Sequence, residues 1–153
     1  MIDLSTYDVF NARAITIGCI TMMVCLFIQA VLVHVATRSI KPLIGRLMNV
    51  KSELAAQFVF LLGALSLLFV HLTQIYVWGY ALHLTDVVRE FNTAVIFAGS
   101  TYTTVGFVND PLPQKWQLLT VIMAASGLFS FGWSTSLMFI LAQKLYPGDT
   151  PSS

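Results

Sequence analysis

Side chains capable of chemistry are sparse in this 153-residue chain, and most of them are hydroxyls. They gather in the run from Ser100 to Thr104, which Gly106 closely follows. The two cysteines, Cys19 and Cys25, lie six residues apart in an apolar run, with no histidine at zinc-ligand spacing. On a helix they would point to different faces. No nucleophile pairs with a base and no metal-ligand cluster is evident, so we expect a protein without enzymatic activity or cofactor.

The composition favours a membrane protein. Apolar residues make up 57% of the chain and charged residues only 10%. A soluble domain of this size needs more charge to stay in solution. The net charge of +1 is too small for a nucleic-acid surface, and we expect no nucleic-acid partner.

Three long stretches without Asp, Glu, Lys or Arg could each cross a bilayer. They cover residues 14–37, 54–85 and 116–143. Their lengths are about 24, 32 and 28 residues, and about 20 apolar residues suffice for a transmembrane helix. The sequence therefore predicts three spans.

The segment between the second and third stretches is too polar at its start to form a fourth span. Its apolar part, Ala94–Gly99, is too short to cross. We expect a re-entrant segment, in which a short helix over Asp86–Thr101 is followed by irregular backbone inside the membrane. Thr85 or Asp86 would be its N-cap.

The distribution of basic residues predicts the orientation. Four of them follow the first stretch: Arg38, Lys41, Arg46 and Lys51. The positive-inside rule places this connection in the cytoplasm, with the N-terminus outside and the C-terminus inside. Aromatic residues would mark the outer interface: Tyr76, Trp78, Tyr80 and Trp116.

The basic connection has two interpretations. Its apolar residues recur at helical spacing, as an interfacial helix on the cytoplasmic leaflet would require: Ile40, Leu43, Ile44 and Leu47. In that case the four basic residues would contact anionic lipid. The alternative is an ordinary basic connector.

Two motifs carry a resemblance to a known family. The run Thr101–Phe107, T-Y-T-T-V-G-F, resembles the T-x-x-T-x-G-[YF] pore signature of potassium channels. It follows a short apolar segment and precedes a full span, as a pore loop does. The stretch Ser126–Thr135 is similar to the inner helix of the simple bacterial two-span potassium channels. Gly127, Gly132 and Thr135 fall on that helix's hinge glycine, second glycine and threonine.

The resemblance covers residues 58–144 and implies an all-α membrane protein: three transmembrane helices, a re-entrant pore helix and a selectivity-filter loop. Such chains assemble as a homotetramer, here expected in a bacterial inner membrane. Backbone carbonyls at the filter replace the water that potassium sheds. The filter would be Thr104, Val105, Gly106 and Phe107, and potassium, the permeant ligand, would be the only metal bound. Thr103 and Thr135 would line the cavity, with Gly127 and Gly132 as hinge candidates; close helix packing is the alternative role of Gly127.

The outer mouth departs from the family. The usual glycine after the signature is replaced by Val108-Asn109 before Asp110, and Asn109 is the residue expected to adopt a positive φ. Ser100 stands where many relatives carry an acidic residue. A passive potassium channel is the main hypothesis. The alternatives are a weakly selective monovalent cation channel of the same fold, or a non-conducting channel-like membrane subunit.

Three parts are expected along the chain: residues 1–54 form the first span and its basic linker, 55–146 the pore domain, and 147–153 a disordered tail. The first span lacks the repeated arginines of a voltage sensor. His34 could sense pH, but an ordinary interfacial position is the more common case, and we interpret His71 and His83 likewise.

Overall fold

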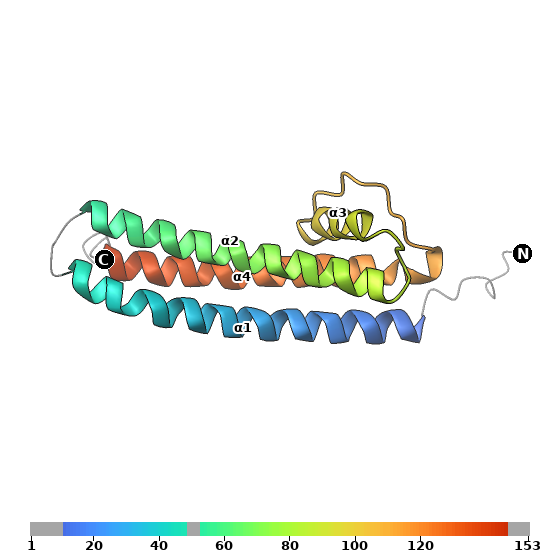
Figure 1. Ribbon diagram of the computed structural model, residues 1–153, viewed down its shortest axis with the longest axis horizontal. Coiled ribbons are helices and arrows are strands. Elements are labelled where there is room, and N and C mark those ends of the chain that lie inside the picture. The colour runs from blue at the N-terminus through green and yellow to red at the C-terminus, as the bar shows by residue number, and fades with distance from the viewer. Residues whose placement is uncertain (1–10, 49–52, 147–153) are drawn as a thin grey trace, which may run out of the picture.

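The computed structural model describes residues 11–48 and 53–146. Within them every regular element is a helix: α1 (Ala12–Met48), α2 (Glu53–Leu84), α3 (Phe91–Tyr102), the short 3₁₀ helix η2 (Gln114–Trp116) and α4 (Leu118–Leu145). The three long helices run side by side as an elongated bundle, and α3 packs on α2 and α4 at one end (Figure 1). The start of α1 shares that end, whereas α4 finishes at the other.

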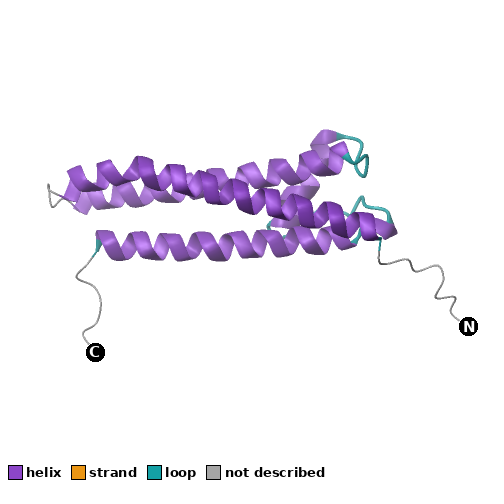
Figure 2. Cartoon of the chain, turned by 90° about the horizontal axis from the view of Figure 1, so that it is seen from below, coloured by secondary structure: helices purple, strands orange, loops and turns teal. Residues whose placement is uncertain are grey.

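Three helices are long and apolar enough to cross a membrane: Ala12–Pro42, Glu53–Leu84 and Gln114–Leu145. Their outward faces carry large apolar side chains that are more than half exposed, among them Phe27, Phe69, Leu128 and Phe139. Soluble monomers rarely expose apolar surface on this scale. For the described residues, the prediction of an all-helical chain with three helices long enough to span a membrane is therefore confirmed, and it is compatible with an integral membrane protein (Figure 2).

The inward face of α1 consists of small and polar residues. Residues three or four apart are buried there: Ala14, Gly18, Thr21, Cys25 and Gln29. Small side chains let neighbouring helices approach closely in a membrane. Cys25 is buried and Cys19 is exposed, and both are free thiols. The prediction that the two cysteines occupy different faces is thus confirmed.

The first connection differs from both interpretations of the sequence. The helix α1 continues through Pro42 to Met48, so residues 38–48 prolong the first helix instead of forming a separate helix or a connector. Arg38 and Lys41 are exposed on this extension. Lys51, the side chain of Arg46 and the predicted tail 147–153 lie outside the described residues.

The short helix begins later than predicted. Thr85 and Asp86 close α2 instead of capping α3: the Thr85 amide donates to the Ala81 carbonyl (3.1 Å). Asp86 takes a left-handed φ of 58°, which turns the chain out of α2. The amides of Val87 and Val88 both return to the Leu82 carbonyl. These local bonds occupy residues 85–88, so α3 starts only at Phe91.

The core lies where α2, α3 and α4 meet. Its large members are Trp78, Leu82, Phe97, Tyr102, Leu119 and Met123. Trp78 is 1% exposed, so the prediction that it belongs to an interfacial aromatic belt is wrong. Tyr76 and Tyr80, by contrast, are exposed on α2.

Gly127 sets the distance between α3 and α4. A Cβ added at this position would overlap with the backbone carbonyl of Tyr102, the last residue of α3. At Gly132, one and a half turns further along α4, an added Cβ would meet nothing within 4 Å. The geometry therefore supports the packing role for Gly127.

We expect Gly127→Ala to destabilise the protein by about 1–3 kcal/mol, because overpacking forces the backbone of a packed core to move. Gly132→Ala is the matched control on the same helix and should leave stability unchanged or slightly higher, since alanine favours helix. Thermal unfolding in detergent, followed by circular dichroism, measures both. Equal melting temperatures for the two variants would contradict the close contact.

Candidate functional site

The backbone following α3 is held by amide hydrogen bonds to the end of that helix. The amides of Val105 and Gly106 both donate to the carbonyl of Ser100, at 3.0 and 3.2 Å. The Thr104 amide donates to the Thr101 carbonyl at 2.9 Å. The amides of these three consecutive residues therefore point back to the C-terminal carbonyls of α3.

The carbonyls of the same loop are left without partners. No carbonyl of residues 103–107 accepts a hydrogen bond from the part of the chain that the structure describes. Backbone carbonyls are strong acceptors and need a partner when water is excluded. A row of such oxygens on one loop can coordinate a cation that has shed its water.

The loop alternates in handedness. Thr104 has φ 60° and Gly106 has φ 66°, whereas Val105 between them does not have a positive φ. Glycine tolerates a left-handed φ without strain, but threonine, which is β-branched, does so only at a cost. A strained residue that persists is held by its surroundings. Here the amide bonds to Ser100 and Thr101 on either side supply that constraint.

Two large apolar side chains of the loop lie open: Val105 is 66% exposed and Phe107 is 71% exposed. In the single chain, therefore, most of the surface of these two side chains is not packed against other residues. These two side chains therefore leave an apolar patch on the loop that another surface could cover.

Ser100 of α3 is 2% exposed and is in hydrogen-bond contact with the loop. Besides its carbonyl, its hydroxyl accepts a bond from the Val108 amide at 3.4 Å. One residue of α3 therefore holds three amides of the loop.

The outer segment differs from the prediction. Neither Val108 nor Asn109 has a positive φ, so the expectation for Asn109 is wrong; Thr104 takes the left-handed conformation instead. Asn109 and Asp110 are exposed. Asp110 folds the chain toward α4 by accepting the Leu112 amide at 2.8 Å and the Thr120 hydroxyl at 3.4 Å.

The predicted cavity residues lie apart. The Thr103 hydroxyl bonds the Gly99 carbonyl of its own helix at 2.7 Å. The Thr135 hydroxyl does the same with Phe131 at 2.9 Å, and its side chain is exposed on α4. Within one chain, therefore, the loop and Gly127 are brought together through α3, while Gly132 and Thr135 lie farther along α4.

A buried polar network, which sequence reasoning missed, connects all four helices beside this loop. Gln74 of α2 is its centre: its amide nitrogen donates to Gln29 of α1 at 2.7 Å. Its carbonyl oxygen accepts the hydroxyls of Tyr102 at 3.0 Å and of Ser130 at 2.9 Å. Gln29 in turn lies 3.4 Å from the Ser130 carbonyl, to which it donates.

Aromatic residues extend the network. His71, one turn before Gln74, lies 2.9 Å from the Tyr102 hydroxyl through Nδ1 and stacks on Phe131 with ring centres 4.2 Å apart. Trp78, one turn after Gln74, donates to the Ser126 hydroxyl at 3.0 Å. His71 is thus a buried member of the site, not an interfacial histidine as predicted.

A sequence signal for the network exists. Gln29, His71 and Gln74 are polar residues inside charge-free stretches, where polar side chains are costly and usually face a partner. Ser126, Ser130 and Ser134 recur every four residues, which places them on one face of α4. The Ser134 hydroxyl is buried and finds no hydrogen-bond partner among the described residues.

Comparison with known proteins finds no family model, no curated relative and no solved structure that matches this chain. Among the described residues, no group of three or more His, Cys, Asp or Glu side chains could hold a metal ion. The loop over residues 103–107, with its unpartnered carbonyls, is therefore the candidate site that the geometry itself singles out.

We expect Gln74→Leu to destabilise the protein by about 2 kcal/mol, at about 0.6 kcal/mol for each of its three hydrogen bonds. Gln143→Leu, at an exposed position near the end of α4, is the matched control and should change stability little. Thermal unfolding in detergent is the measurement. A Gln74→Leu protein as stable as the control would show that the network contributes no net stability.

Proposed function

We propose that the chain is the subunit of a tetrameric, potassium-selective cation channel, with residues Thr104–Phe107 as its filter. One observation carries the proposal: the loop after α3 turns its amides to Ser100 and Thr101 and leaves its carbonyls free. A cation path through a membrane needs oxygen ligands that replace water, and unpartnered carbonyls supply them. The resemblance of Thr101–Phe107 to the potassium-channel signature is the reason for proposing potassium as the permeant ion.

Tetramer formation follows from the chemistry of coordination. One loop provides only one wall of a filter, and a ring of four identical walls surrounds the ion. Cyclic symmetry closes such a ring. The exposed Val105 and Phe107 side chains would then be covered by neighbouring subunits or by each other around the axis. The helix α3 ends at Tyr102, and the partial negative charge at its C-terminus would favour a cation nearby.

The orientation proposed with this function places the basic end of the bundle in the cytoplasm. Arg38, Lys41 and Lys144 lie on the parts of α1 and α4 that are remote from α3. By the positive-inside rule the loop then faces the outside, and the chain begins outside and ends in the cytoplasm.

A weakly selective monovalent cation channel is the second candidate. The observation in its favour is the outer segment, where Val108-Asn109 replaces a glycine and adopts no positive φ. The outermost oxygens would then be arranged differently from those of the inner part of the loop. Reversal potentials in opposed potassium and sodium gradients distinguish the two candidates.

We expect Gly106→Ala to abolish potassium flux, because alanine at φ 66° is strained by about 1–2 kcal/mol and would rotate the neighbouring carbonyls. The measurement is barium-sensitive potassium uptake into liposomes that contain the purified protein. Gly45→Ala, at an open position of α1 where a Cβ meets nothing, should retain flux. Undiminished flux in Gly106→Ala would remove the filter assignment, and no flux in the native protein would favour a non-conducting subunit.

We expect replacement of Val108-Asn109 by a single glycine to raise the potassium-to-sodium permeability ratio. A tenfold rise would correspond to about 1.4 kcal/mol of added discrimination between the two ions. Planar-bilayer recordings under bi-ionic conditions measure the ratio. Lys115→Gln, an exposed change outside the loop, is the control for altered surface charge. An unchanged ratio would show that the outer segment does not limit selectivity.

A further inference from the structure

A groove of about 150 Å³ lies between α1, α2 and α4 at the end of the bundle remote from α3. Its walls are mainly aliphatic and come from all three helices, for example Val33, Leu67, Leu137, Met138 and Leu141. Packed protein interiors rarely leave voids larger than a water molecule. The three helices therefore diverge here, in contrast to their tight packing around Trp78 and Tyr102.

The polar side chains within the groove are already satisfied by their own helices. The Thr37 hydroxyl donates to the Val33 carbonyl at 2.8 Å, and the Ser66 hydroxyl donates to the Leu62 carbonyl at 2.8 Å. Both hydroxyl protons are therefore already donated, and neither hydroxyl requires a polar ligand as an acceptor. The interior of the groove is thus suited to a hydrocarbon chain.

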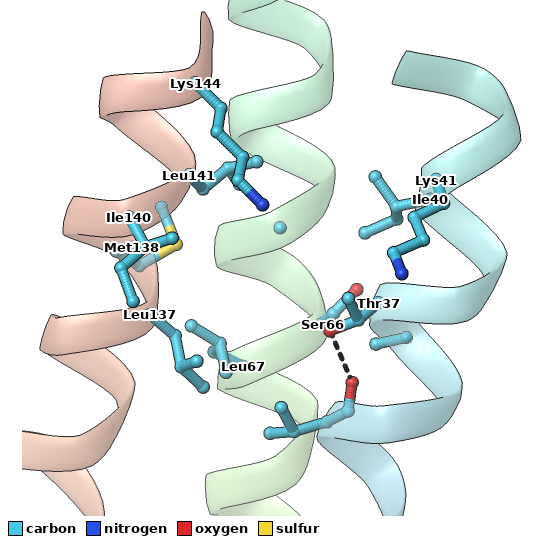
Figure 3. Close-up of a pocket in the computed structure, with 13 residues that line it drawn as sticks. Thr37, Ile40, Lys41, Ser66, Leu67, Leu137, Met138, Ile140, Leu141 and Lys144 are labelled. Atoms are coloured by element: carbon cyan, nitrogen blue, oxygen red, sulfur yellow. Dashed lines mark hydrogen bonds between the residues drawn. The ribbon is translucent and has the colours of Figure 1, made fainter. Parts of the chain in front are cut away.

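Two lysines form the rim. Lys41 of α1 and Lys144 of α4 both line the groove, and in Figure 3 their amino groups extend from opposite helices toward the space between them. Among the described residues, Glu53 is the acidic side chain at this end of the bundle. It opens α2 ten residues before Gly63, the first residue of that helix to line the groove.

We infer that this groove binds an anionic membrane phospholipid, with one acyl chain between the three helices and the phosphate between Lys41 and Lys144. The choice of occupant rests on location and charge. The helices that form the groove are apolar enough to lie in a bilayer, and the basic residues that line the groove, Lys41 and Lys144, lie at its rim. The inference does not depend on the proposed channel activity. It extends the lipid contact expected for Lys41 to a site shared with α4.

The test uses the full-length protein in detergent, incubated with equal amounts of phosphatidylglycerol and phosphatidylcholine that carry the same acyl chains. Native mass spectrometry then counts the lipid molecules retained per chain. We expect phosphatidylglycerol to be retained preferentially. Lys41→Gln with Lys144→Gln should reduce that preference about 25-fold, since each basic residue near the headgroups contributes roughly a factor of five.

Two further variants make the test specific. Arg13→Gln with Lys115→Gln removes the same charge at the opposite end of the bundle and should leave the preference unchanged. Ala36→Phe fills the groove while keeping both lysines, and should reduce retention of both lipids. Three results would each overturn the site. The first is equal retention of the two lipids by the native protein, and the second is an equal loss of phosphatidylglycerol preference in the two double variants. The third is retention of both lipids by Ala36→Phe at the native level. Because ion flux is not measured, failure here is distinguishable from failure of the channel proposal.

Discussion

The hydrogen bonds around Gln74 are the constraint on which the helix arrangement depends. In an apolar bundle no water is available to hydrogen-bond a buried amide. The free-energy penalty of leaving such a polar group unpaired exceeds the net stabilisation that one hydrogen bond contributes. Gln74 uses both ends of its amide, and its partners come from α1, α3 and α4. Apolar packing alone would let helices slide along one another, since lipid is as apolar as leucine. The network removes that freedom by fixing each helix at one height.

The same constraint reaches the loop over residues 103–107 through α3. Tyr102 is the last residue of that helix, and its hydroxyl and its carbonyl are held from different sides: the hydroxyl by Gln74, the carbonyl by the close approach of Gly127. Ser100, two residues earlier, is thereby placed to receive the loop amides. The position of the unpartnered carbonyls is thus determined by side chains that lie outside the loop.

The sequence predicts the three long apolar helices, and a short helix followed by irregular backbone between the last two, because the absence of charge and the length of an apolar run are local signals. It places α3 five residues early, because Thr85 and Asp86 suit a helix start but act here as a helix end. It misses Gln29, His71 and Gln74, since their partners lie 28 or more residues away or on another helix. It also misassigns Trp78, which is buried in the core and donates a hydrogen bond to Ser126 on α4. The burial and the partners of these residues are determined by pairing between distant parts of the chain and not by local sequence preference.

The two glycines of α4 differ in what a bend would disturb. A bend at Gly127 would separate α4 from the Tyr102 carbonyl and disturb the end of α3. Gly132 lies beyond Ser130, the last α4 residue held by Gln74, and a Cβ added at Gly132 would meet nothing within 4 Å. A bend there would move the segment that carries Lys144 and one wall of the groove while leaving the loop in place. Because Gly132 is separated from the contacts between α4 and α3, the C-terminal part of α4 could bend without moving the carbonyls of the loop over residues 103–107.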